Sequence, residues 1–340
     1  MPPRTASLIV NPQAGSLLDR SITPEDLAEQ VSASGIDVTL LTGDPSDLDG
    51  LIDRAIGSDR ELIIVAGGDG TVNAAARRVA GTDKTLAILP AGTLNHLSQD
   101  LGIPQNFEGA IRVLSDGAPV EIDIGEVNGH SFLCSSVIGF ASRLARQREH
   151  WRGRLNPLRW ARVIARLAGT MDRDPEVSVA VPEPNGATLR TRHLTVAVGD
   201  YLDEPGRLFV RTQLDGGLLG LYAIPQPSAA KVLKLFATAL AGRWRSDPEI
   251  TATRVKAATV TSEHKQIRVL NDGEILLLDQ PVEYRIRRRA LRVIRAPGAE
   301  EAATALADRG TAARETAARE TAARETAARE TAARETAAVS

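Results

Sequence analysis

The sequence predicts an α/β + β protein, in which an N-terminal α/β domain precedes a C-terminal β-sandwich domain. Through about residue 115, short apolar segments alternate with helix-like patterns. This rhythm indicates a parallel sheet with helices on both faces. From Val120 onward most apolar runs are strand-like and turn residues separate them, which favours a sandwich. We place the boundaries at 1–121 for the first domain, 122–298 for the second and 299–340 for a tail.

In the first domain, local signals in the sequence indicate where helices and strands should begin and end. Thr23 is a typical N-cap with Pro24 at the first helical position, and Gly35 ends that helix. The expected strands are Ser7–Val10, Ile36–Leu41, Leu62–Val65 and Leu86–Leu89, with a further helix at Asp47–Ile56. Ligands of parallel sheets bind beyond the carboxyl ends of the strands. The loops that follow these strands are therefore the candidate site.

The second domain reads as a series of short strands with one helical insert at Ser228–Leu240. The expected strands are Val177–Val181, His193–Val198, Leu208–Val210, Leu218–Ile224, Ala258–Thr261, Gln266–Val269, Glu274–Leu278 and Val282–Ile286. Residues 311–335 of the tail are five copies of Thr-Ala-Ala-Arg-Glu. A period of five keeps no single apolar face on a helix, so we expect the tail to be dispensable.

Composition excludes several classes of protein. The single cysteine, Cys134, allows no disulfide within the chain and fits a reducing cytoplasm. No apolar run approaches the ~20 residues of a spanning helix, and the start lacks the pattern of a secretory signal. The net charge of −2 indicates no particular partner. We expect a cytoplasmic protein whose membrane contact is peripheral, at the inner face of the cell membrane.

The strongest local signal is a glycine-rich loop between a strand and a helix, Gly67-Gly68-Asp69-Gly70-Thr71 followed by Asn73. Glycines permit positive φ and let backbone N–H groups approach a phosphate closely. The helix that follows adds its positive N-terminal end. The loop has neither the dinucleotide fingerprint nor the Gly-Lys-Ser/Thr of a P-loop. A plain strand-to-helix turn is the alternative, but three glycines with Asp and Thr favour a phosphate site.

Two further turns carry candidate chemistry. In the turn Pro90–Thr93, Thr93 can cap the next helix or bond a phosphate oxygen. His96, just beyond it, is a candidate ligand or base but is as readily structural. Near the end of the chain, Asn271-Asp272-Gly273 is a good hairpin turn. The turn does not explain Glu274, whose carboxylate opens an apolar strand and can serve as a general base.

These motifs occur in one order: Asn11-Pro12-x-x-Gly15, Gly67-Gly68-Asp69-Gly70-Thr71-x-Asn73, Pro90-x-Gly92-Thr93-x-Asn95 and Asp272-Gly273-Glu274. Together they resemble the diacylglycerol kinase catalytic-domain family, which includes bacterial soluble lipid kinases and sphingosine kinases, over residues 6–297. The resemblance implies a nucleotide-binding α/β domain of the NAD-kinase and diacylglycerol-kinase type, with the active site between it and the sandwich. It implies ATP contacts at Asn11, Thr42, Gly67, Gly68, Asp69, Gly70, Thr71, Asn73 and Thr93. It also implies Glu274 as the proton acceptor, with Asp272 beside it, and Mg²⁺ on the phosphates with Asp69 as a candidate direct or water-mediated partner.

The chain departs from the family pattern in two places. Relatives often have Asn-Asp where this chain has Asn95-His96. Relatives also often carry Asp-Gly-x-Leu as a structural magnesium site in the second domain. Here Asp215 is the candidate metal ligand, but it is displaced by one residue, and Gly216 takes the expected Asp position. The resemblance therefore does not decide whether this chain has the second metal site.

The segment 143–173 holds nine arginines against two acids. Trp160, Ile164 and Leu167 recur at helical spacing there, with Arg159, Arg162 and Arg166 on the opposite face. A basic amphipathic helix can lie in a lipid headgroup layer, although an ordinary surface helix is the alternative. Nucleic acid is not an expected partner, because aromatic residues make up only 3% and no nucleic-acid motif is present. The sequence leaves a homodimer open.

The sequence thus predicts an ATP-dependent lipid kinase that transfers the γ-phosphoryl group to the hydroxyl of a diacylglycerol-like or sphingoid-like lipid at the membrane surface. Two alternatives stand beside it. A soluble-substrate kinase of the NAD kinase type would share the Gly-Gly-Asp-Gly loop but lacks the Asp272–Glu274 element. A catalytically inactive nucleotide-binding regulator is the second alternative, because the stretch around Asp215 departs from the family pattern.

Overall fold

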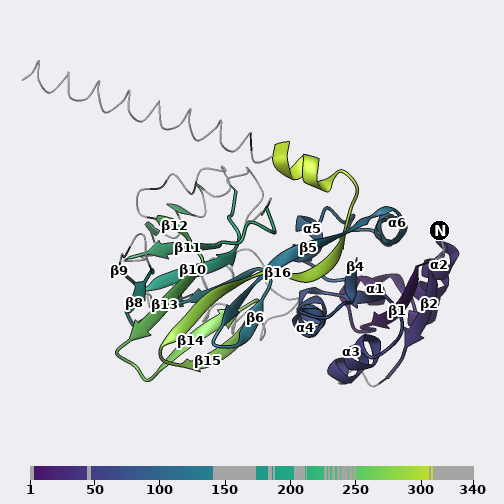
Figure 1. Ribbon diagram of the computed structural model, residues 1–340, viewed down its shortest axis with the longest axis horizontal. Helices are drawn as coiled ribbons and strands as arrows, with labels where there is room; N and C mark the ends of the chain where they lie inside the picture. The colour runs from purple at the N-terminus through teal and green to yellow at the C-terminus, as the bar shows by residue number, and fades with distance from the viewer. Residues whose placement is uncertain are drawn as a thin grey trace, which may run out of the picture.

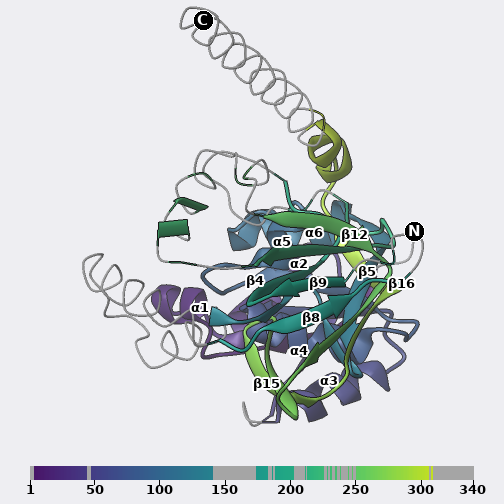
Figure 2. The ribbon, with the colours of Figure 1, turned by 90° about the vertical axis from the view of Figure 1, so that its left-hand side faces the viewer.

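The computed structural model describes residues 4–43, 47–140, 174–182, 188–202, 213–225 and 251–305, with single residues between and beyond these ranges. The segment 143–173, the strand predicted at Leu208–Val210, most of 228–240 and the repeats 311–335 lie outside the described residues. An α/β domain and a β-sandwich lie side by side, and two long strands run from one into the other (Figure 1). Figure 2 views the molecule from the sandwich end.

The α/β domain is built on four parallel strands, as the sequence predicts, and the structure gives their order as β2-β1-β3-β4. They are β1 (Thr5–Val10), β2 (Asp37–Leu41), β3 (Leu62–Gly67) and β4 (Thr85–Pro90). The helices are α1 (Gly15–Arg20), α2 (Pro24–Ala33), α3 (Leu48–Ile56), α4 (Asp69–Val79), α5 (His96–Asp100) and α6 (Phe107–Asp116). Every residue of β3 and β4 is buried, as expected of central parallel strands covered on both faces.

Local signals set the ends of α2 as predicted. The Thr23 side chain accepts a hydrogen bond from Asp26 N at 3.1 Å, and the Asp26 carboxylate accepts one from Thr23 N at 2.9 Å. This reciprocal capping box satisfies two N–H groups at the helix start, and Pro24 needs no partner there. Gly35, with φ of 88°, reverses the chain after the helix.

The two domains share one continuous sheet through the last strand, β16 (Val282–Arg295). Its end pairs in parallel with β4, and its beginning pairs antiparallel with β13 (Ala257–Ser262) of the sandwich. The antiparallel β5 (Ala118–Val127) follows β16 past a register shift between Arg287 and Leu291. The sequence predicted only Val282–Ile286 of this strand. The remainder brings Leu291, Val293 and Ile294 into the core of the α/β domain.

The second sheet is antiparallel, with strand order β12-β11-β10-β7-β14-β15. Its strands are β7 (Ser135–Ile138), β10 (His193–Val198), β11 (Leu219–Ile224), β12 (Thr251–Val255), β14 (Gln266–Asn271) and β15 (Glu274–Asp279). The sandwich half of the first sheet adds β6 (His130–Phe132), β8 (Val177–Ala180) and β9 (Thr188–Thr191). Apolar residues of both sheets form one core, in which the Phe132 ring meets Tyr284 edge-on at 6.2 Å. The predicted sandwich is confirmed.

Residues just beyond Gly298 belong to the folded structure. Residues 299–305 are helical, and a Cβ at Gly102 would lie only 2.6 Å from Ala299 Cβ, so the two segments are in close contact. Ala296 N also donates to Leu101 O at 3.1 Å. The dispensable part of the tail should therefore begin later than Gly298.

Truncation after Gly310, which removes only the repeats and the last few residues, should leave the melting temperature unchanged. Truncation after Gly298 should lower the melting temperature, because it uncovers the surface at Gly102. Calorimetry of the two truncated chains beside the full chain checks this. A lower melting temperature after removal of the repeats alone would mean that they pack on the folded domains.

Candidate active site

The loops predicted to contact a nucleotide all lie at one edge of the parallel sheet. Asn11 follows β1, Thr42 follows β2, Gly68 follows β3 and Thr93 comes soon after β4. The strand register places Val10 beside Ala66 and Gly67 beside Pro90, so these strand ends are level. The Thr42 and Thr93 side chains are exposed at this edge.

The glycine-rich loop leads directly into α4. Gly68 is the N-cap residue and no described side chain caps the helix. The first intrahelical hydrogen bond runs from Val72 N to Gly68 O at 3.0 Å. The N–H groups of Asp69, Gly70 and Thr71 precede it, so this turn can bind an anion such as a phosphate.

Polar side chains that are buried or partly buried hold the loop in place. Asn11 Nδ2 donates to Thr71 Oγ1 at 3.0 Å, and Asn11 N donates to Ala66 O at 2.9 Å. Thr71 and Asn73 are both buried within α4. The structure therefore places Asn11 and Thr71 in the support of the loop and buries Asn73, and the exposed edge belongs to Gly70 and Thr93.

Two reasons were predicted for the glycines of this loop, and the first of them, positive φ, is wrong. None of Gly67, Gly68 and Gly70 has positive φ. A Cβ at Gly67 would lie 2.6 Å from Thr71 Cβ, and one at Gly68 would lie 3.2 Å from Gly92 Cα. Close packing, and not left-handed backbone, therefore excludes larger residues: at Gly67 against Thr71 of the same loop, and at Gly68 against the turn after β4. Gly70 differs, because a Cβ there would meet no atom within 4 Å.

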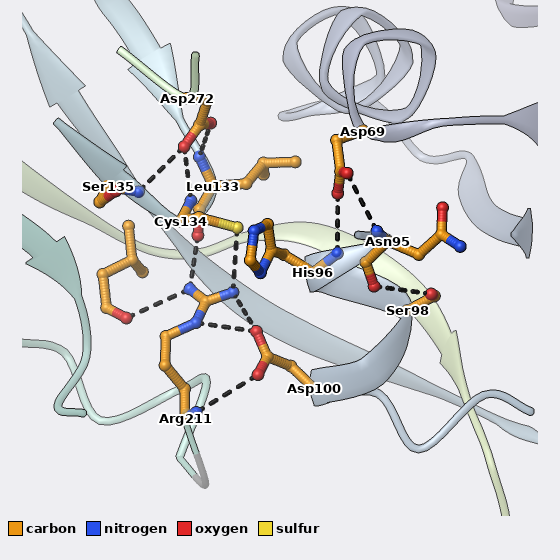
Figure 3. A network of polar contacts seen from close by, with 11 residues as sticks. Asp69, Asn95, His96, Ser98, Asp100, Leu133, Cys134, Ser135, Arg211 and Asp272 are labelled. Carbon is orange, nitrogen blue, oxygen red and sulfur yellow. Dashed lines mark hydrogen bonds and ion pairs between the residues drawn. The ribbon is translucent and has the colours of Figure 1, made fainter. Parts of the chain in front are cut away.

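Asp69 joins the glycine-rich loop to the turn after β4. Its carboxylate accepts hydrogen bonds from Asn95 N at 3.0 Å and His96 N at 2.7 Å, at the start of α5 (Figure 3). The cap residue of α5 is Asn95, in left-handed conformation, and not Thr93. The Asn95 side chain also bonds both N and O of Gly92 at 2.9 Å. Sequence reasoning missed this bracing role of Asn95, although a left-handed asparagine is a known turn signal.

Asp272 anchors the predicted hairpin to the start of β7. Asp272 and Gly273 have φ of 47° and 94°, as a tight two-residue turn between β14 and β15 requires. The Asp272 carboxylate accepts hydrogen bonds from Leu133 N at 2.6 Å and from Cys134 N and Ser135 N at 2.9 Å. Burial raises the pKa of Asp272, while the three N–H donors and Arg211 act in the opposite direction.

Glu274 projects from this hairpin toward the first domain. Its Oε2 lies 2.7 Å from Nη1 of Arg77, a residue of α4. The Glu274 side chain is 56% exposed. Nε and Nη2 of Arg77 are buried and find no partner among the described residues. The candidate base of the second domain is therefore held against the last turn of α4, the helix whose first turn is the candidate phosphate site.

A buried ion pair joins the domains beside these loops. Arg211 Nε and Nη2 bond Asp100 Oδ2 of α5 at 2.9 and 2.6 Å, and Nη1 bonds Leu133 O at 2.5 Å (Figure 3). The two side chains are only 2% and 7% exposed. Burial is the largest single influence on the pKa of Arg211 and acts to lower it, but Asp100, Cys134 and Tyr201 together act in the opposite direction and the pKa is raised. No sequence motif marks either residue.

The candidate metal ligand Asp215 is not brought together with other ligands. Its side chain is exposed, and no group of three or more His, Cys, Asp or Glu side chains forms a metal site within the described part of the chain. The loop beside it is held by Asp123, which is buried. Asp123 Oδ2 accepts a hydrogen bond from Gly217 N at 2.5 Å, and Asp123 Oδ1 accepts one from Arg289 N at 2.8 Å.

Asp272→Asn should lower the free energy of unfolding by about 1–3 kcal/mol, because one of the three N–H donors would then face an NH₂ group. Loss of one of the three contacts should also displace the hairpin. Urea unfolding measures the loss, and Asp279→Asn, at the exposed far end of the same hairpin, is the control. Equal stability of the two variants would mean that the hairpin does not depend on these amide contacts.

Comparison with known proteins agrees with the fold. Residues 5–127 match the diacylglycerol kinase catalytic domain, and residues 136–295 match the YegS C-terminal NAD kinase beta sandwich-like domain. A diacylglycerol kinase of Mycobacterium tuberculosis is 31% identical over 281 residues, which cover 77% of this chain and 85% of the relative. The chain belongs to the diacylglycerol kinase catalytic-domain family. It is a phosphotransferase of the lipid kinase class.

Other relatives are similar over a smaller part or in fold alone. The "Probable lipid kinase YegS-like" of Klebsiella pneumoniae is 36% identical over 114 residues, 32% of this chain and 38% of that protein. A diacylglycerol kinase structure from Bacillus anthracis superposes with a TM-score of 0.63 at 21% identity, covering 87% of this chain and 98% of the other. A kinase of this family implies ATP use, and these relatives support neither alternative function. Within the described residues, no helix has the length and apolar character to cross a bilayer.

Proposed function

We propose that this chain is an ATP-dependent kinase that transfers the γ-phosphoryl group of ATP to the hydroxyl of a diacylglycerol-like or sphingoid-like lipid. One observation supports this above all. The uncapped first turn of α4 belongs to the first domain, and the second domain holds a carboxylate, Glu274, against Arg77 in the last turn of the same helix. An anion site and a candidate base thus come from facing domains, as a transfer between two bound substrates needs.

In this proposal the phosphates of ATP bind to the N–H groups at Asp69–Thr71. Thr42 and Thr93 line the same exposed edge and contact the nucleotide. Mg²⁺ bound with ATP would neutralise charge on the phosphates. Asp69 is the carboxylate of the loop that would hold the ion, through the lone pairs that its two amide contacts leave.

Glu274 takes the proton of the lipid hydroxyl. Its Oε2 is occupied by Arg77, and the described contacts leave Oε1 for the proton. The hydroxyl oxygen then attacks the γ-phosphorus in line, and the bond to the β-phosphate oxygen breaks to release ADP. Asp272 acts indirectly, because it holds in place the hairpin that carries Glu274.

A panel of acceptors tests the proposal. The full chain is incubated with Mg·ATP and vesicles that each contain one lipid: diacylglycerol, a sphingoid base, an isoprenoid alcohol or phosphatidylglycerol. Mass spectrometry should show one lipid gaining a phosphate. Phosphorylation of NAD in place of every lipid would favour the NAD kinase alternative, and ATP binding without turnover would favour the regulator.

We also propose a peripheral position at the inner face of the cytoplasmic membrane, through the arginine-rich segment 143–173. Replacing Arg159, Arg162 and Arg166 with Gln should weaken sedimentation with anionic vesicles at low salt. Each arginine near such a surface contributes about 1 kcal/mol, and salt screens the attraction. Replacing three arginines of the repeats, Arg314, Arg319 and Arg324, is the matched control. Equal sedimentation of both triple variants would leave the segment without a membrane role.

The homodimer remains a separate proposal, which analytical ultracentrifugation tests.

A further inference from the structure

The family resemblance implies a structural magnesium ion at the loop around Asp215, but this loop is closed by protein groups alone. Asp123 N donates to Leu214 O at 2.7 Å, and the Asp123 carboxylate holds the N–H groups of Gly217 and Arg289. Magnesium requires near-octahedral oxygen ligands, usually with one or two carboxylates. Asp215 is exposed, Gly216 offers no side chain, and the Asp123 oxygens already accept two amides. These residues do not fit a structural magnesium ion.

The buried cation at the domain junction is Arg211. Its guanidinium reaches the first domain through Asp100 and the second through the carbonyls of Leu133 and Val198, at 2.5 and 3.2 Å. It also contacts Cys134 Sγ at 3.5 Å. A planar guanidinium with five donors suits one carboxylate and several carbonyls at once, and it remains charged at every physiological pH.

Arg211 lies in the middle of a chain of direct contacts between the two halves of the site. On one side, Asp100 ends α5, whose first N–H group is held by Asp69 of the glycine-rich loop. On the other side, Leu133 accepts from Arg211 and donates to Asp272, two residues before Glu274. Figure 3 shows this path from Asp69 through Asp100 and Arg211 to Asp272.

We propose that Arg211 is a positioning residue, a built-in cation that fixes the hairpin of Glu274 relative to the nucleotide loop, and that the loop around Asp215 binds no structural magnesium ion. The positioning part rests on the proposed function, in which Glu274 is the base. The metal part stands independently of it.

The metal part is tested on the unaltered full chain without nucleotide. The melting temperature is measured in EDTA and in a series of MgCl₂ concentrations at constant ionic strength. We expect no dependence on magnesium. An ion that binds only the folded state raises the melting temperature with its concentration. Such a rise would overturn the inference.

The positioning part is tested with a double variant, Asp100→Leu with Arg211→Met. Arg211→Met alone leaves a buried carboxylate unpaired and should unfold the junction, whereas removing both charges is often tolerated. In the double variant kcat should fall more than about 10-fold, because a misplacement of about 1 Å suffices for such a loss. ATP affinity should not change, because the α4 turn is intact. The control is Glu108→Leu with Arg112→Met, an exposed pair on α6.

Two readouts separate the possible failures. If the double variant turns over like the wild type, Arg211 only packs the junction and the inference fails. If the wild type phosphorylates no acceptor, the proposed function fails, and amide hydrogen exchange at Leu133–Ser135 then decides the inference. The double variant should lose protection there and keep it in β1 and β3. Unchanged protection at Leu133–Ser135 would overturn the positioning role.

Discussion

Glu274→Gln should lower kcat on the true lipid by at least ~10², the usual contribution of a positioned general base. Glutamine keeps the length of the side chain and can still accept the hydrogen bond of Arg77 through its carbonyl oxygen. The hairpin should therefore stay in place, with its Asp272 anchor intact. ATP affinity should change little, because the phosphate site belongs to the other domain. Single-turnover kinetics with the identified lipid measure the effect.

The matched control is Glu283→Gln, an exposed glutamate in the sandwich half of β16. It loses the same charge from the same domain and should turn over normally. Phosphoryl transfer has a loose transition state, which can make proton removal late and the base less important. A Glu274→Gln rate within ~3-fold of wild type, far below a general base's contribution, would mean that another group accepts the proton. Glu274 would then serve only as the partner of Arg77.

The parts of this molecule that could be predicted from sequence are those fixed by neighbours in the chain. The start of α2 depends on Thr23, Pro24 and Asp26, which are adjacent. The convergence of Asn11, Gly68 and Thr93 follows from their places after parallel strands. The hairpin at Asp272 is a two-residue turn, and its own residues, Asp272 and Gly273, are of the types that such a turn prefers.

The rest depends on contacts between distant residues, which no local pattern reveals. The extension of β16 past Ile286 is an example, because its strongly charged run Arg287–Arg289 looks like a strand end. There the strand makes a bulge, with Arg289 in left-handed conformation, and then enters the other domain. Arg211 and Asp100 are separated by 111 positions in the sequence, and Arg77 and Glu274 by 197 positions. A charged residue in a polar stretch reads as a surface residue, so the sequence offers no signal that Arg211 is buried.

Gly70→Val should weaken ATP binding by more than about 100-fold while leaving the protein folded. A Cβ at this position meets no protein atom within 4 Å, and valine has a better helix propensity than glycine. The space it would fill lies at the first turn of α4, where the proposal places the phosphates. Loss of two charge-assisted hydrogen bonds, each about 1.5–3 kcal/mol, accounts for a change of this size. Calorimetric titration with ATP measures it.

Two other glycines make this experiment specific. Gly68→Val places a Cβ at 3.2 Å from Gly92 Cα, so it should separate the two loops and lower both ATP affinity and the melting temperature. Gly57→Val, at the end of α3 and away from both loops, should change neither. Loss of ATP binding in Gly68→Val alone would show only that the loops must touch. If folded Gly70→Val binds ATP as tightly as wild type, the phosphates do not lie on the first turn of α4, because a branched side chain on that turn would otherwise displace them.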